Sequence, residues 1–463
     1  MKHLFTLFFI ILFGLSHAQT QVSGTQSGTW TLSNSPYQVT GHITIPSGQT
    51  LTIEPGVTVN FQGHYRIYVD GKLLANGSES QPVLFTTDDI STGWAGIRLY
   101  ETSDISVFNY CKFEYGKTSA TGSYPDQHGG AVVLKDANAE FYHCTFENND
   151  ATGDNDGMGG AVYCMNTGSS TETLTKFIDC TFHNNYAFGE GGAIKFTNDG
   201  KTEITRCTFS NNSAGYGGGA ILFYTAYDVH ITQSLFYNNT SFNSGGGAIK
   251  TLNPQTDLYF TNCTFTQNTA DGYADGGAVY LAYADAVFTN CIIYDNSQQY
   301  GTDVNIGQNA TANFNYCDVD LPDFATGTNN LSNVNPQFVN ASQGDFHLQL
   351  TSPCIDAGID VGLDYVGNAP DIGCFEYGAA SINPYVSRTF KIFPNPATDV
   401  VYIDLKNMNT GMLVVKNMTG QIFLSKKLNK NLSAISLSDL PCGIYLLKLE
   451  TKQGIFEQKL IKK

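Results

Sequence analysis

The sequence predicts an all-β chain built mainly as a parallel β-helix, because two short motifs alternate through its middle at a nearly constant period. Half a period separates each Gly-Gly-Ala-[Ile/Val] from a Cys-Thr-Phe-x-Asn-Asn motif or a close variant of it. A fixed period between about 20 and 50 residues is typical of a stack of like units. The Gly-Gly-Ala motif recurs in steps of 30, 32, 27, 28 and 30 residues, at Gly129, Gly159, Gly191, Gly218, Gly246 and Gly276.

Each period holds short strands and no helical pattern. After Gly-Gly-Ala, apolar residues alternate with mixed ones, as in Ile194, Lys195 and Phe196, which is the two-residue period of a strand. Near Asn262 the alternation slips by one residue. Such a slip exchanges the two faces of a strand, so we expect a corner there. About three strands per period, with corners between them, are therefore predicted.

The second motif supplies two columns of like residues. Its last asparagine is predicted to form an internal amide ladder that satisfies buried backbone groups at a turn. The ladder asparagines are Asn149, Asn185, Asn212, Asn239, Asn268 and Asn296. Its cysteines, with Ser234 in one place, are expected to be small buried thiols facing the core. Cys354 and Cys374 stand outside this column, and a disulfide between them is a hypothesis for an exported protein.

The alternating F-x-x-N and G-G-A-[IV] motifs resemble the repeats of chlamydial polymorphic outer-membrane proteins and, more broadly, the right-handed parallel β-helix superfamily. The resemblance covers roughly residues 105–320, and we assign residues 105–334 to the repeats. Residues 40–75 and 82–99 resemble the first coils of secreted Bacteroidetes β-helix proteins, and residues 19–104 are interpreted as an N-terminal cap with those coils. Residues 335–378 resemble the closing module, often named choice-of-anchor, that follows β-helices in bacterial surface proteins.

The end of the chain has a different character. After a linker at residues 379–388 it carries P-N-P-A-T-D, then G-x-Y-x-L-K-L from Gly443, and a basic terminus. Residues 389–463 therefore resemble the type A C-terminal sorting domain of the type IX (Por-type) secretion system. The resemblance implies a Bacteroidetes source, recognition by the type IX machinery and export across the outer membrane. Removal of the domain with surface attachment or release would follow, and its alternating strands predict a small β-sandwich.

Residues 1–18 read as a secretory signal peptide, because Lys2 and His3 precede an apolar run and small residues precede Gln19. That run is too short to span a bilayer, and no later segment reaches the roughly 18 apolar residues that spanning needs. Residues 19–380 carry 36 acidic and 11 basic side chains, which disfavours nucleic acid as a partner. The sequence predicts an extracellular protein, secreted or attached to the outer-membrane surface, without a transmembrane segment.

Parallel β-helices host polysaccharide lyases and hydrolases. A lyase needs a basic residue, and a hydrolase needs two carboxylates that face each other. The residue before each column cysteine points outward, and it places His143, Asp179 and Arg206 on neighbouring coils. These three are the catalytic candidates. The competing interpretation is a partly exposed ion pair worth less than about 1 kcal/mol.

Two further sets are candidates for binding. Tyr163, Lys195, Lys250 and Tyr280 share an outward column, where tyrosines stack on sugars and lysines contact carboxylates or sulfates; the alternative is an ordinary solvated face. The loops before Gly-Gly-Ala hold acidic residues with oxygen ligands for calcium, and flexible acidic turns are the alternative. These residues are Asp154, Asp156, Asp271 and Asp275.

Two functions from different classes follow. Regular coils without a polar constellation favour a non-catalytic adhesin or glycan-binding scaffold, with polysaccharides or surface glycans as partners. The alternative is a secreted polysaccharide lyase or glycoside hydrolase acting on the β-helix face. No cofactor other than possible calcium is indicated.

Overall fold

The protein is described here by a computed structural model. It covers residues 19–119, 124–153, 156–167, 174–253, 256–272, 276–298 and 301–378, and most strands of residues 391–462 with their short flanks. The predicted signal peptide and linker lie outside the described residues. The chain forms two compact units, residues 1–379 and 380–463. Among the described residues, no helix is long and apolar enough to cross a bilayer.

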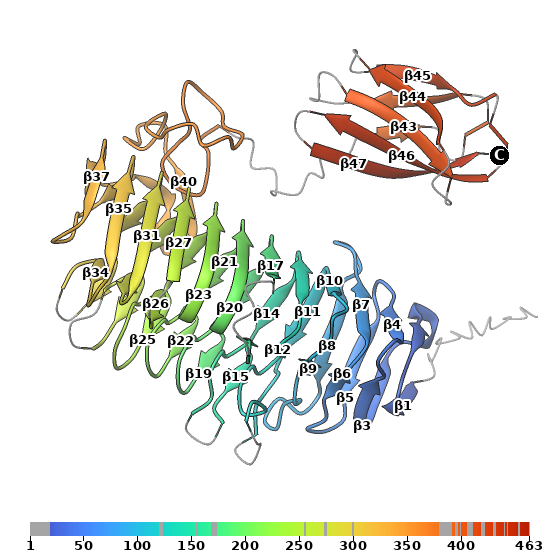
Figure 1. The fold of residues 1–463 in the computed structure, drawn as a ribbon, viewed down its shortest axis with the longest axis horizontal. Coiled ribbons are helices and arrows are strands. Elements are labelled where there is room, and N and C mark those ends of the chain that lie inside the picture. The colour runs from blue at the N-terminus through green and yellow to red at the C-terminus, as the bar shows by residue number, and fades with distance from the viewer. Residues whose placement is uncertain are drawn as a thin grey trace, which may run out of the picture. The chain divides into compact units, whose positions relative to one another are not determined.

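The predicted parallel β-helix is confirmed. One 32-stranded parallel sheet winds around the stack and gives it three faces (Figure 1). The first face follows Gly-Gly-Ala and contains β6 (Ile67–Val69), β9 (Ile97–Tyr100), β12 (Val132–Lys135), β16 (Val162–Met165), β20 (Ile194–Thr205), β23 (Ile221–Thr232), β26 (Ile249–Leu252), β30 (Val279–Leu281) and β34 (Val304–Ile306).

The second face includes the later halves of β20 and β23. Its other strands are β2 (Gly28–Trp30), β4 (Thr50–Ile53), β7 (Lys72–Asn76), β10 (Ser106–Asn109), β13 (Ala139–Tyr142), β17 (Leu174–Ile178), β27 (Thr256–Thr261), β31 (Ala284–Thr289), β35 (Thr311–Asn315) and β37 (Thr326–Thr328). This face turns a corner into the third face at the residue before each column cysteine.

The third face begins with β1 (Thr20–Thr25), a 3₁₀ turn (Leu32–Asn34) and β3 (Tyr37–Ile45), whose end also pairs with β6. It continues through β5 (Thr58–Phe61), β8 (Val83–Thr87), β11 (Cys111–Glu114), β14 (Thr145–Glu147), β18 (Thr181–His183), β21 (Thr208–Ser210), β24 (Leu235–Tyr237), β28 (Thr264–Thr266), β32 (Ile292–Tyr294), β36 (Asp318–Val319) and β38 (Leu331–Ser332).

The expectation of about three strands per period misses a fourth, very short strand in six coils. These strands form a separate parallel sheet of β15 (Asp150–Ala151), β19 (Tyr186–Ala187), β22 (Ser213–Ala214), β25 (Thr240–Ser241), β29 (Thr269–Ala270) and β33 (Ser297–Gln298). A strand of two residues is shorter than one alternation of buried and exposed positions, so its sequence carries no period that could reveal it.

Inside the stack, identical residues lie on top of one another. The rings of Phe146, Phe182 and Phe209 stack with centroids 4.7 Å apart, and the column continues through Phe236 and Phe265 at the same spacing. This distance is the spacing between neighbouring strands of a sheet. Each ring is fully buried. The aromatic column therefore fixes the register between coils.

Corners are made by residues with positive φ. The corner between the second and third faces has φ of 53° at His143, 56° at Asp179 and 50° at Asn262. At the next corner, Asn148 and Asn184 both have φ of 55°. Asparagine and aspartate tolerate this left-handed conformation better than most side chains do. The slip in the sequence near Asn262 thus coincides with a corner.

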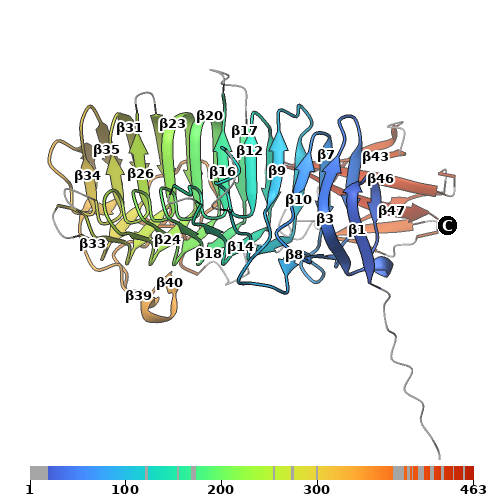
Figure 2. The ribbon, with the colours of Figure 1, turned by 90° about the horizontal axis from the view of Figure 1, so that it is seen from below.

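Residues 335–378 turn back along the stack instead of extending it. The strands β39 (Phe338–Asn340) and β40 (Asp345–Leu348), joined by a 3₁₀ turn (Ala341–Gln343), form an antiparallel hairpin that packs on the third face, where Phe346 lies 5.1 Å from Tyr237. We call this the closing hairpin, and it lies near β24 in Figure 2. The later loop covers a corner: Asn262 Nδ2 donates to the carbonyl of Asp371 at 3.1 Å.

The second unit contains two antiparallel sheets around one apolar core, as a β-sandwich requires. One sheet has the order β41 (Lys391–Phe393), β42 (Val400–Asp404), β45 (Leu432–Ser436). The other has the order β44 (Ile422–Leu428), β43 (Gly411–Asn417), β46 (Gly443–Thr451), β47 (Gly454–Lys462).

Candidate functional site

The three catalytic candidates lie together at the corner between the second and third faces. Arg206 donates from Nε and Nη2 to the two carboxylate oxygens of Asp179, at 2.6 and 2.8 Å. Nδ1 of His143 lies 3.9 Å from the same carboxylate, and its ring stacks on Tyr110 at 4.4 Å. The three residues lie on successive coils, so the column is a ladder along the corner. We call it the corner ladder.

Burial and charge determine the state of this ladder. The side chains of His143 and Asp179 are 9% and 7% exposed, whereas that of Arg206 is 36% exposed. Burial lowers the pKa of His143; the carboxylate of Asp179 opposes this effect and the cation of Arg206 adds to it. The imidazole is therefore neutral near pH 7. The bidentate ion pair leaves Arg206 and Asp179 engaged with each other.

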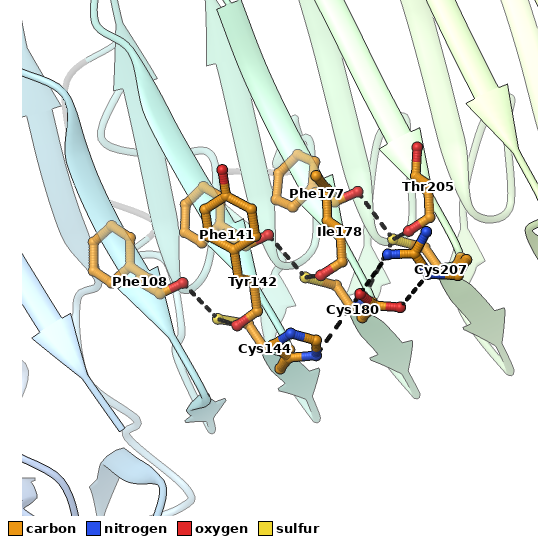
Figure 3. Close-up of polar contacts among 12 residues, drawn as sticks. Phe108, Phe141, Tyr142, Cys144, Phe177, Ile178, Cys180, Thr205 and Cys207 are labelled. Carbon is orange, nitrogen blue, oxygen red and sulfur yellow. Dashed lines mark hydrogen bonds and ion pairs between the residues drawn. The ribbon is translucent and has the colours of Figure 1, made fainter. Parts of the chain in front are cut away.

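Behind the corner ladder, the column thiols complete the backbone hydrogen bonding. Sγ of Cys144 lies 3.4 Å from the Phe108 carbonyl of the preceding coil, and Sγ of Cys207 lies 3.3 Å from that of Phe177 (Figure 3). Burial raises the pKa of Cys144, Cys180 and Cys207 well above the ordinary thiol value, so these groups stay protonated and act as weak donors.

Ser234 occupies the equivalent position of the column, where a hydroxyl oxygen replaces the thiol sulfur. Its hydroxyl donates to the Thr232 carbonyl at 2.9 Å and accepts from the backbone N–H of Cys207 at 3.1 Å. Cys180 N–H donates to Cys207 Sγ at 3.4 Å in the equivalent way. The column is thus a hydrogen-bonded ladder that accepts sulfur or oxygen, and its cysteines show the geometry of a structural element.

The six ladder asparagines lie one above the other at the corner between the third face and the short fourth strands. Side-chain amides of successive coils are joined at 2.9–3.0 Å, from Asn149 to Asn185 and onward to Asn296. Each amide nitrogen also donates to a carbonyl of the preceding coil, as Asn185 does to Phe146 at 3.0 Å. Each amide oxygen accepts a backbone N–H of that coil, as Asn185 does from Asn149 at 3.1 Å.

The column of tyrosines and lysines is covered, which contradicts the alternative interpretation of a solvated face. It is not a solvated face, because Tyr163, Lys195 and Lys250 are only 2%, 5% and 8% exposed. The glycine-rich loops fold over the first face and cover it. Lys195 Nζ lies 2.6 Å from the carboxylate of Glu190 in such a loop.

The remaining members of this column are also engaged within the protein. The Tyr163 hydroxyl bonds to that of Tyr124 at 3.1 Å, Lys250 Nζ reaches Ser244 Oγ at 3.3 Å, and the Lys250 ammonium lies 5.7 Å from the ring centre of Tyr280. A ligand would have to displace these contacts. The sequence could not show the covering because the path of the loops leaves no periodic signal.

Two of the four calcium candidates, Asp154 and Asp275, lie outside the described residues. Asp156 and Asp271 are exposed and belong to different loops. Within the described ranges, no three His, Cys, Asp or Glu side chains are grouped so that they could hold a metal ion.

The disulfide hypothesis is corrected by the structure, in which Cys354 and Cys374 are both free thiols. Cys354 is buried with Ile292 and Leu348, and its Sγ lies 3.9 Å from Asp318. The backbone N–H of Cys374 instead donates to Thr264 Oγ1 at 3.0 Å. The two cysteines serve different packing contacts of the same folded-back loop.

Sequence reasoning missed a buried ion cluster under the loop before the first Gly-Gly-Ala. Arg98 is fully buried and its Nε lies 3.6 Å from Asp126, which also pairs with Arg66. Tyr100 donates its hydroxyl to Asp126 at 2.7 Å. Burial lowers the pKa of Arg98 to about 10, so the guanidinium remains charged. Arg98 donates to the Gly129 carbonyl at 3.1 Å, which anchors the covering loop.

A signal for this cluster exists in the sequence. The segment A-G-I-R-L that contains Arg98 resembles the repeated Gly-Gly-Ala strand one coil earlier, and β9 pairs in register with β12 so that Arg98 lies beside Val133. Extending the repeat by this coil would have placed a cation on the covered column. Its partner Asp126 lies in a loop, where no period predicts position.

Three segments of the chain match family models. Residues 160–342 match a right-handed β-helix region, and residues 24–135 match a pectate-lyase-like β-helix domain. Residues 391–463 match a secretion system C-terminal sorting domain.

The chain is a right-handed β-helix protein with a C-terminal sorting domain. Its sorting domain indicates export, as a secreted or cell-surface protein. None of the curated proteins matches the chain.

Proposed function

We propose that this β-helix protein is a non-catalytic adhesin or glycan-binding scaffold at the surface of a Bacteroidetes cell. In this proposal the type IX secretion machinery recognises residues 389–463, exports the chain and leaves its β-helix attached to the cell or released. The signal peptide at residues 1–18 would deliver the chain to the periplasm beforehand.

One observation carries the non-catalytic part of the proposal: the candidate catalytic groups are already neutralised by the protein itself. A lyase needs a basic side chain that can reach the substrate, and Arg206 is held bidentately by Asp179. Lys195 is buried and paired with Glu190. Breaking either pair to engage a substrate would leave an uncompensated charge, which is costly when it is buried.

The test uses the full chain on a glycan array, together with a panel of uronate and neutral polysaccharides. Unsaturated products and new reducing ends are followed with calcium and with chelator. Binding without turnover is the expected result. Turnover of any polysaccharide would overturn the non-catalytic proposal, and an absence of both binding and turnover would overturn the glycan-binding one.

A polysaccharide lyase or glycoside hydrolase is the second candidate. It is favoured by the pectate-lyase-like match over residues 24–135. If turnover is observed, Arg206→Gln should abolish it under this candidate, because Arg206 is the partly exposed cation among the catalytic candidates.

A further inference from the structure

The closing hairpin and the third face enclose an open cleft of about 490 Å³. Tyr294 and Asp295 line it from the end of β32, while Asn335, Gln337, Phe338 and Gln349 line it from the folded-back segment. Small-molecule sites usually have volumes of about 300–1,000 Å³, so the cleft is large enough for a ligand. It is distinct from the corner ladder and from the covered first face.

The walls of the cleft are held by hydrogen bonds within the folded-back segment. Gln349 Nε2 donates to the Phe338 carbonyl at 2.8 Å, and the backbone N–H of Gln337 donates to Asn335 Oδ1 at 2.8 Å. Thr351 donates its hydroxyl to Gln337 Oε1. One polar atom of each side-chain amide is therefore already hydrogen-bonded within the wall, so the arrangement is ordered before a ligand arrives.

The other polar atom of each side-chain amide is available to a ligand. The Nδ2 of Asn335, the Nε2 of Gln337 and the Oε1 of Gln349 make no hydrogen bond to the described residues. The carboxylate of Asp295 is exposed and is likewise not bonded to a described side chain. The lining thus offers both hydrogen-bond donors and acceptors.

Two half-buried aromatic rings, those of Tyr294 and Phe338, complete the lining. An aromatic face packs against the C–H groups of a sugar ring, while a carboxylate and carboxamides bond to its hydroxyls. Charge selects among sugars: Asp295 is the one carboxylic acid among the described residues of the lining, and residues 19–380 carry 36 acidic against 11 basic side chains. An anionic glycan would be repelled, whereas hydroxyl donors bond strongly to a carboxylate.

We propose that this cleft is a binding site for a neutral glycan, with Tyr294 as the stacking platform and Asp295 as the main hydroxyl acceptor. The proposal rests on the glycan-binding function proposed above and gives it a site and a ligand class. The proposed function says only that the protein binds glycans, whereas this proposal also says where. The variants can therefore contradict the site without contradicting glycan binding.

The test measures binding of maltotetraose, cellotetraose, mannotetraose, chitotetraose and tetragalacturonate to the full chain by calorimetry. Asp295→Asn is the main variant, because asparagine has the same shape and occupies the equivalent corner at Asn148 and Asn184 with φ of 55°. Tyr294→Ala removes the platform. Tyr259→Ala is the matched control, since Tyr259 is an exposed tyrosine on the second face.

We expect at least one neutral tetrasaccharide to bind, with affinity about tenfold or more weaker in Asp295→Asn and Tyr294→Ala and unchanged in Tyr259→Ala. If Asp295→Asn and Tyr294→Ala bind a neutral glycan as the unaltered chain does, the cleft is not the site, although glycan binding stands. Preference for tetragalacturonate overturns the ligand class. Binding of no glycan overturns both this site and the glycan-binding part of the proposed function. If Tyr294→Ala does not fold, Asp295→Asn alone decides.

Discussion

The guanidinium of Arg206 donates two hydrogen bonds, of 2.6 and 2.8 Å, to the carboxylate of Asp179 on the preceding coil. Both residues have positive φ, 51° and 56°, so the pair bridges two corners of adjacent coils. His143 lies on the other side of the same carboxylate. The charge state of the histidine therefore reports whether the ion pair is intact.

Arg206→Gln should raise the pKa of His143, because the nearby cation lowers it. Asp179→Asn should lower the pKa, because the carboxylate stabilises the imidazolium. Both replacements suit the corner, since Gln233 and Asn262 occupy it with φ of 47° and 50°. NMR titration of the imidazole signals measures the shift. His230, which pairs with Asp228, is the internal control, and equal shifts at both histidines would contradict the ladder.

Asn212→Ala should lower the free energy of unfolding by roughly 2–5 kcal/mol, because it removes an amide that bonds to Phe182 and Asn239 and accepts from Asn185. Two backbone groups, the N–H of Asn185 and the carbonyl of Phe182, would lose this partner. The midpoint of urea unfolding measures the change. Asn211→Gly is the control, since Asn211 is exposed, has φ of 54° and suits glycine. An equal loss in both variants would rule out the ladder as the cause.

Cys207→Ser should change stability by less than about 1 kcal/mol, because Ser234 already performs the same bonding one coil later. Cys207→Ala should cost more, since it deletes both the donor to Phe177 and the acceptor for Cys180. Thermal unfolding of the two variants beside the unaltered chain measures the order. Equal losses for serine and alanine would mean that the thiol contributes only volume.

Asp318→Asn should stabilise the protein at pH 8. Burial raises the pKa of Asp318 to about 6, and its Oδ1 accepts the backbone N–H of Val334, which an amide oxygen can also do. A raised carboxyl pKa means that the folded state prefers the protonated form. Its contribution is full below the unfolded value near 4 and is lost as the pH rises through about 6.

The expected gain from Asp318→Asn at pH 8 is up to about 3 kcal/mol, and it should vanish near pH 4. Unfolding midpoints across this range measure it. Asp323→Asn is the control, because Asp323 is exposed. A gain that is independent of pH would show that titration of Asp318 is not its origin.

Asp126→Asn should destabilise the protein by about 3 kcal/mol, because it leaves the buried cation of Arg98 without its counter-charge. Glu101→Gln removes the surface pair with Lys135 and should cost less than about 1 kcal/mol. Urea unfolding of both variants gives the comparison. Similar small losses would mean that the carbonyls of Gly129 and His128 suffice to hold Arg98.

The stack of coils can be predicted from the sequence because each coil repeats the same pattern of core and corner residues. Phe146 and Asn149 recur in register, so their period predicts both the columns and the fold. The covered first face is not readable, because Glu190 reaches Lys195 through a loop whose path has no period. The contact of Asn262 with Asp371 joins residues from unlike segments, and no repeat predicts it.

The amide ladder gives the stack a direction. Asn185 accepts the N–H of Asn149 and donates to Phe146, so it completes the turn of the coil before its own. Asn212 does the same for the coil of Asn185. The last turn of a partly folded stack therefore lacks these two hydrogen-bond partners. Folding from the first coil toward the last would complete each turn only when the next coil is added.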